Sequence, residues 1–118
     1  MNATLVTGGL GFVGRYVVSQ LRAAGRVVVS YNRDFSESED DGVAAVQGEL
    51  FDIPRLVTVA REHDVAPVIH TAALSHPGLS IDLPITTFAA NVDGTVHLLE
   101  AARMAGVGRV VNFSSECA

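Results

Sequence analysis

Three glycines follow the first apolar run of this chain and restrict what it can fold into. Gly8, Gly11 and Gly14 lie in the segment TGGLGFVG with the spacing G-x-x-G-x-x-G. Because glycine has no Cβ, such a segment can turn sharply from a buried strand into a helix and let a pyrophosphate approach that helix's unpaired N–H groups. The motif therefore predicts dinucleotide binding, and the alternative is a glycine-rich turn without a ligand.

Short runs of apolar and β-branched residues recur along the chain at strand length. Continuous runs of this kind are typical of strands buried on both faces of a parallel sheet. The five predicted strands are residues 3–7, 27–31, 43–47, 67–71 and 109–113. Because helical patterns alternate with these runs, the chain is predicted to form an α/β fold with a doubly wound parallel sheet and right-handed crossovers.

Two helices are predicted in the first half of the chain. The first follows the glycine motif and carries Val13, Val17 and Leu21 at helical spacing. The second begins near Asp52, whose side chain can cap it, and has Pro54 in its first turn, where a missing N–H costs little. This helix is predicted to end at about His63.

A third helix is predicted from about Thr86 to Met104, with Gly106 just beyond its end. Apolar residues recur along it at the spacing of one helix face. The residues predicted on that face are Ala89, Val92, Val96, Leu99 and Ala102.

Composition narrows the classes of partner and site. The chain has 118 residues, which fits one domain spanning 1–118. Its net charge of −5 argues against nucleic-acid binding, which needs clustered Lys and Arg. No apolar run reaches the roughly 18 residues of a membrane span, and the N-terminus lacks a secretory signal, so we expect a cytoplasmic protein without membrane contacts. The four histidines lack ligand spacing, and no metal site is predicted.

Several segments of the chain resemble one enzyme superfamily. Thr7 with the glycine motif resembles the short-chain dehydrogenases/reductases, and GFVG is similar to their extended branch, the NAD(P)-dependent sugar epimerases, dehydratases and reductases. The other segments that carry the resemblance are GELFD (48–52), VIHTAA (68–73), NVDGTVHLLEAAR (91–103) and RVVNFSS (109–115). The likeness covers essentially the whole chain and implies a Rossmann-type sheet, with about five strands present.

The resemblance also implies what is missing. Members of this superfamily continue with a Tyr-x-x-x-Lys motif, further strands and a C-terminal substrate domain, and none of these follows Ala118. We therefore expect an N-terminal part of a longer enzyme, without activity on its own.

Most of the residues implied to bind the cofactor come from the motif segments. Phe12 and Val13 are implied at the pyrophosphate turn, and Glu49 and Leu50 beside the adenine. Asn91 is expected to bond backbone groups of a neighbouring strand, since a buried unpaired amide would cost free energy. The full set is Thr7, Gly8, Gly11, Phe12, Val13, Gly14, Asn32, Arg33, Glu49, Leu50, Thr71, Ala72, Ala73, Leu74, Asn91 and Ser114.

Ser115 corresponds to the catalytic hydroxyl of the superfamily, and Ser114 precedes it on the cofactor side. A hydroxyl there can donate a hydrogen bond to a substrate oxygen and share its proton with a Tyr base. The alternative role for both serines is to satisfy backbone groups at the strand end. The resemblance favours catalysis by Ser115.

The end of the second predicted strand bears on the choice of cofactor. NAD enzymes usually carry an acidic residue there for the ribose 2′-hydroxyl, and NADP enzymes carry Arg for the 2′-phosphate. Asn32 occupies the acidic position when the chain is counted from Gly25, and Arg33 follows it, which favours NADP. If the strand extends two residues further, Asp34 takes the position and NAD is the cofactor.

The resemblance implies an NAD(P)-dependent epimerase, dehydratase or reductase that transfers a hydride between the nicotinamide and a small-molecule substrate, most simply a nucleotide-sugar. A non-catalytic NADP-binding sensor or scaffold of the same fold is the alternative. A third, weaker option is a dehydrogenase of a non-sugar alcohol.

Overall fold

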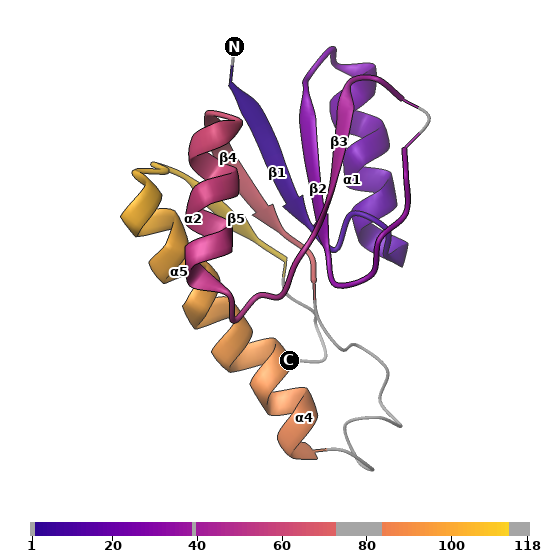
Figure 1. The fold of residues 1–118 in the computed structure, drawn as a ribbon. Coiled ribbons are helices and arrows are strands. Elements are labelled where there is room, and N and C mark those ends of the chain that lie inside the picture. The colour runs from indigo at the N-terminus through magenta and orange to yellow at the C-terminus, as the bar shows by residue number, and fades with distance from the viewer. Residues whose placement is uncertain (1, 39, 73–83, 114–118) are drawn as a thin grey trace.

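The computed structural model describes residues 2–38, 40–72 and 84–113. Its strands form one parallel sheet in the order β3-β2-β1-β4-β5, shown in Figure 1. They are β1 (Ala3–Thr7), β2 (Val28–Asn32), β3 (Val43–Gln47), β4 (Val65–His70) and β5 (Val110–Asn112). The chain adds β2 and β3 on one side of β1 and then β4 and β5 on the other. The strand order therefore reverses between β1 and β4, and sheets of this kind bind ligands in the crevice at the carboxyl ends of those two strands.

Helices cover both faces of this sheet. Helix α1 (Phe12–Ala23) contacts β1 and β2 on one face, whereas α2 (Ile53–Glu62) and α5 (Gly94–Ala105) pack together on the other, as Figure 1 shows. Right-handed crossovers require this, because the β1 to β2 step moves along the sheet in the opposite direction to the steps into β4 and β5. The predicted doubly wound α/β sheet is confirmed.

The predicted strands are all present, with small differences in their bounds. β1 and β3 match the predictions, and β2 lies one residue later than predicted. β4 begins two residues early, at Val65, and its register with β1 shifts between Ala3 and Leu5. The shift lets Pro67, which has no N–H to donate, lie within a strand. β5 is shorter than predicted.

Helix α2 begins as the sequence predicts. The Asp52 side chain accepts a hydrogen bond from the Arg55 N–H at 3.1 Å, and a proline occupies the first turn. Helix α1 begins differently, because its N-cap is Gly11 and no side chain caps it. The N–H groups of its first turn therefore have no side-chain acceptor at the cap.

The third predicted helix consists of three segments, and of its predicted apolar face Ala102 is buried whereas Val92, Val96 and Leu99 are exposed. The segments are α4 (Pro84–Phe88), the π-helix η1 (Ala89–Asp93) and α5. Val92, Val96 and Leu99 are 44%, 58% and 48% exposed, whereas the residues buried on α5 are Gly94, Leu98, Ala101 and Ala102. Small residues beside Leu98 allow α5 to pack closely on α2, and Val96 and Leu99 lie on the outer side.

The hydrophobic core lies between the sheet and α2 with α5. Leu5, Tyr31, Leu56, Val68 and Leu98 belong to it, and each is at most 2% exposed. The core fixes the carboxyl ends of β1, β2 and β4 relative to one another, and the candidate site lies at those ends.

Candidate functional site

The glycine loop connects β1 to α1 in a tightly packed turn. Gly8 has a φ of +69°, a left-handed conformation that L side chains rarely adopt. A Cβ on Gly14 would overlap the Gly8 carbonyl oxygen, and a Cβ on Gly8 would come within 3.0 Å of the Ala72 backbone. The loop can therefore hold the first turn of α1 directly against the ends of β1 and β4 only with glycine at these positions.

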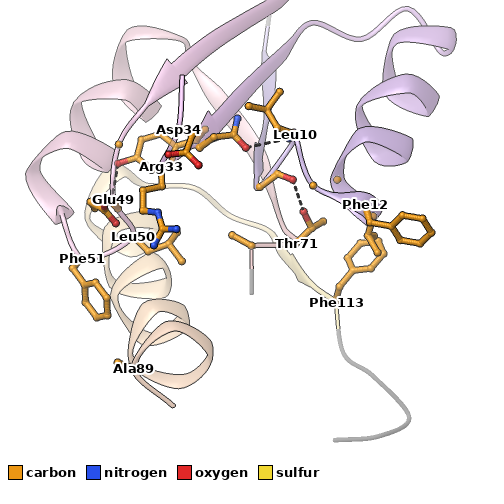
Figure 2. A pocket seen from close by; sticks show the side chains of 18 of the residues that line it. Leu10, Phe12, Arg33, Asp34, Glu49, Leu50, Phe51, Thr71, Ala89 and Phe113 are labelled. Atoms are coloured by element: carbon orange, nitrogen blue, oxygen red, sulfur yellow. Dashed lines mark hydrogen bonds between the residues drawn. The ribbon is translucent and has the colours of Figure 1, made fainter. Parts of the chain in front are cut away.

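A cavity of about 740 Å³ opens at this edge of the sheet (Figure 2). The glycine loop, the ends of β2 and β4, the segment after β3 and the start of the third helix surround it. Its lining residues are Gly8, Leu10, Gly11, Phe12, Val13, Gly14, Tyr31, Asn32, Arg33, Asp34, Gly48, Glu49, Leu50, Phe51, Thr71, Ala72, Thr86, Ala89 and Phe113. Figure 2 shows Arg33 and Leu50 at one end of it and Phe12 and Phe113 at the other.

Asn32 joins the end of β2 to the glycine loop. Its Oδ1 accepts a hydrogen bond from the Leu10 N–H at 3.1 Å, and its Nδ2 donates to the Ser30 Oγ at 2.8 Å. The Ser30 hydroxyl lies under Gly9, where a Cβ would overlap it. Both ends of the Asn32 amide are thus engaged with protein groups, so this side chain supports the loop.

The segment after β3 rests on Tyr31. The buried Tyr31 hydroxyl donates to the Glu49 carbonyl oxygen at 2.8 Å, and a Cβ on Gly48 would overlap the Tyr31 ring. Burial first, and then the Asp52 carboxylate, raise the pKa of Tyr31 to about 12. The hydroxyl is therefore protonated at neutral pH and keeps its role as a donor.

The end of β4 is bonded to the end of β1. The Thr71 Oγ1 donates to the Thr7 carbonyl oxygen at 2.6 Å, and the Thr71 N–H lies 3.1 Å from the Thr7 Oγ1. The Ala72 N–H donates to the same Thr7 Oγ1 at 3.3 Å. Thr7 is fully buried, so it holds the floor of the cavity from behind.

The cavity brings together most of the described residues that the sequence marks for cofactor binding. Thr7 and Asn91 do not line it. Thr7 lies beneath the floor, and Asn91 lies in η1, where its carbonyl oxygen accepts a hydrogen bond from the Thr95 hydroxyl at 2.8 Å. The predicted residues outside the described part of the chain are Ala73, Leu74, Ser114 and Ser115.

Sequence reasoning missed several residues that shape the cavity. Tyr31 and Gly48 form its support under the segment after β3, and Phe51 and Phe113 add aromatic surface. The signal for the first pair is a tyrosine at the end of a buried strand and a glycine directly after the neighbouring strand. Nothing in the local sequence identifies Phe113 as a lining residue, because the fold brings it there.

The described residues contain no cluster of three or more His, Cys, Asp or Glu side chains that could hold a metal ion. In the same part of the chain, no helix has the length and apolar character needed to cross a membrane. Among the described residues, the charged ones that line the cavity are Arg33, Asp34 and Glu49.

Known proteins share both the sequence and the fold. A curated UDP-glucose 4-epimerase from Rhizobium leguminosarum bv. trifolii is 37% identical over 117 residues, which cover 97% of this chain and 35% of that protein. The solved UDP-glucose 4-epimerase of Stenotrophomonas maltophila, with bound NAD and formylated UDP-arabinopyranose, has a TM-score of 0.87 and 32% identity, over 99% of this chain and 38% of that one. The Brucella ovis enzyme in complex with NAD has a TM-score of 0.86 and 31% identity, over 95% and 35%.

The chain thus spans about a third of the length of most of the curated relatives it matches. The model of the NAD dependent epimerase/dehydratase family matches residues 4–118, which include the glycine loop, the cavity and the end of β5. The chain belongs to the NAD dependent epimerase/dehydratase family.

Proposed function

We propose that this chain forms the dinucleotide-binding part of an NAD-dependent nucleotide-sugar epimerase, with UDP-glucose as the first substrate to test. The observation that carries the proposal is the cavity at the carboxyl ends of β1 and β4, which lies over a glycine loop too tight for any Cβ at Gly14. UDP-glucose is the substrate in the names of several relatives.

The cavity residues suit a dinucleotide bound across the sheet edge. The uncapped first turn of α1 offers its N–H groups to the pyrophosphate at Phe12 and Val13. Leu50 and the Glu49 carboxylate lie where an adenine would pack and accept a hydrogen bond. Thr71 and Ala72 form the floor on the nicotinamide side, together with Ala73, Leu74 and Ser114, which stay assigned by resemblance.

NAD is the cofactor we propose, in place of the NADP that the sequence favours, because the solved relatives hold NAD. In the structure, Asn32 is committed to the glycine loop and Asp34 lines the cavity beside Arg33. A carboxylate at Asp34 can accept a hydrogen bond from a ribose 2′-hydroxyl and would repel a 2′-phosphate. β2 ends at Asn32, so Asp34 reaches the cavity from the loop that follows.

When bound, NAD would accept a hydride from the sugar and return it. The residues of this chain hold and orient it: the glycine loop positions the pyrophosphate, and the ends of β1 and β4 position the nicotinamide side. Ser115, outside the described residues, would donate a hydrogen bond to the reacting sugar oxygen.

Calorimetric titration and a turnover assay test this proposal. We expect the whole enzyme, of which this chain is proposed to form the dinucleotide-binding part, to bind NAD more tightly than NADP and to interconvert UDP-glucose and UDP-galactose. Ser115→Ala should bind NAD normally and lose turnover by about 10²-fold or more, the size of a general acid–base contribution. NAD binding without conversion of any nucleotide-sugar would favour the sensor or scaffold alternative.

A second titration tests the cofactor choice. The proposal predicts that Arg33→Ala leaves the NAD to NADP affinity ratio nearly unchanged, because Asp34, and not Arg33, is proposed to face the 2′ position of the ribose. Gln20→Ala, an exposed position on α1 away from the cavity lining, is the control. A large loss of NADPH binding in Arg33→Ala alone would restore NADP as the cofactor.

A further inference from the structure

A buried histidine connects the cavity floor to the third helix. His70, the last residue of β4, is 3% exposed. Its Nδ1 lies 2.6 Å from the Thr7 Oγ1, and its Nε2 lies 3.0 Å from the Thr95 Oγ1 on α5. The two contacts place the imidazole between two hydroxyl groups, on opposite sides of the ring.

The hydroxyl on α5 fixes the proton on one ring nitrogen. Thr95 has one hydroxyl hydrogen, and it donates this hydrogen to the Asn91 carbonyl oxygen at 2.8 Å. Towards His70 the Thr95 Oγ1 can therefore only accept. The Nε2 of His70 must carry a hydrogen to make this bond.

The Thr7 hydroxyl on β1 indicates the same tautomer, because it constrains the other ring nitrogen, Nδ1. The Thr7 Oγ1 accepts hydrogen bonds from the Ala72 N–H at 3.3 Å and from the Thr71 N–H at 3.1 Å, which it shares with the Thr7 carbonyl oxygen at 3.2 Å. A hydroxyl oxygen has two lone pairs, so both are in use and the hydroxyl hydrogen remains to be donated. The Nδ1 of His70, 2.6 Å away, can accept this hydrogen, and it must then be unprotonated.

We propose that His70 is a neutral imidazole with its hydrogen on Nε2, and that it acts as a positioning residue, fixing the Thr7 hydroxyl that holds the Thr71 and Ala72 backbone at the cavity floor. The role in ligand binding rests on the proposed function, since it concerns the dinucleotide assigned to that cavity.

The surroundings of His70 agree with a neutral ring. Burial lowers the pKa of His70, and no charged side chain contributes to this shift. The groups at its nitrogens come from β1 and α5 and are threonine hydroxyls, and Asn112 of β5 is its register partner in the sheet. An imidazolium would place its Nδ1–H against the Thr7 hydroxyl hydrogen. The hydrogen bond between His70 and Thr7 at the cavity floor would then be lost.

Nuclear magnetic resonance of the imidazole nitrogens tests the protonation state. We expect the His70 signals of the Nε2–H tautomer at neutral pH, with a pKa below 6.5, the ordinary histidine value. A signal from the Nδ1–H tautomer, or from an imidazolium at pH 7, would overturn the assignment. This readout needs no ligand.

Binding measurements test the positioning role. In Thr95→Val the Nε2–H loses its acceptor, and we expect the Kd for NAD to rise about fivefold, the order of one hydrogen bond. Thr95→Ser keeps the hydroxyl and should restore the wild-type Kd. Thr58→Val, the same change at an exposed residue of α2 that does not line the cavity, is the control.

The outcomes separate the two proposals. If the wild type does not bind NAD, the proposed function fails, while the tautomer is still decided by the spectrum. If the wild type binds NAD and Thr95→Val has an unchanged Kd, the positioning role of His70 fails and the proposed function stands.

Discussion

The Tyr31 hydroxyl on β2 donates a hydrogen bond to the Glu49 carbonyl oxygen, 2.8 Å away in the segment after β3. The Tyr31 ring also occupies the space that a side chain at Gly48 would need. The buried Tyr31 side chain therefore fixes the position of the segment that carries Glu49 and Leu50 along the cavity.

Removing this hydroxyl should loosen the segment. In Tyr31→Phe the Glu49 carbonyl loses its donor, and we expect a loss of about 1 kcal/mol in the free energy of unfolding and a several-fold weaker affinity for NAD. Urea denaturation and calorimetry measure the two effects. Tyr16→Phe, at a ring that is 60% exposed, should change neither. Equal behaviour of the two variants would show that the Glu49 contact is unimportant.

Gly14→Ala should prevent the glycine loop from forming. The new Cβ would overlap the Gly8 carbonyl oxygen, and backbone must move to make room. We expect destabilisation by about 3 kcal/mol or more and no measurable NAD binding. Gly108→Ala is the matched control, because no atom lies within 4 Å of a Cβ there. Normal NAD affinity in Gly14→Ala would contradict the packing described for the loop.

His70 should make stability depend on pH on the acid side of neutrality. Burial lowers the pKa of His70 in the folded state below the ordinary 6.5. The unfolded chain therefore binds a proton first as the pH falls, and stability is complete above 6.5 and lost below it, by at most about 1.4 kcal/mol per pH unit. Urea denaturation at pH 5.5 and 7.5 measures the difference in the free energy of unfolding. The Thr95→Val variant, which removes a contact of the His70 ring, can be compared at the same two pH values. Identical stability at both values would contradict the neutral, buried ring.

Two adjacent leucines on α5 offer a test of the corrected helix face. Leu98 is 2% exposed and Leu99 is 48% exposed. Leu98→Ala should cost about 2 to 5 kcal/mol because it leaves a cavity against the core, whereas Leu99→Ala should cost well under 1 kcal/mol. Thermal or urea unfolding of the two variants decides this. The reverse order would support the face predicted from the sequence.

Asn32→Asp should sharpen the preference for NAD. An aspartate can still accept from the Leu10 N–H, and the Ser30 hydroxyl can turn to donate to it, so the loop should survive. The added negative charge lines the cavity and should raise the NAD to NADP affinity ratio about tenfold, or roughly 1.4 kcal/mol. Gln20→Glu, the same chemical change on an exposed residue of α1, is the control. An unchanged ratio would place the 2′-position of the ribose elsewhere.

Much of the fold and part of the site follow from local sequence signals. The alternation of apolar runs and helices gave the sheet, and Asp52 gave the start of α2, because caps and strand patterns act within a few residues. Only Ala102 of the predicted face packs inward on α5, since Gly94 is buried there for its small size rather than its hydrophobicity. The roles of Asn32 and Tyr31 depend on bonds to segments 22 and 18 residues away, which no local pattern contains.

The central position of β1 has a consequence during synthesis of the protein. β1 is made first, yet it pairs with β4, which begins at Val65, roughly 60 residues later. At ribosomal rates of about 5 to 20 residues per second, the edge of β1 that pairs with β4 stays unpaired for about 3 to 12 s. The contacts of Thr7 with His70 and of Gly8 with Ala72 can form only after that interval, so this edge of β1 in a nascent chain would remain exposed to chaperones until β4 has emerged.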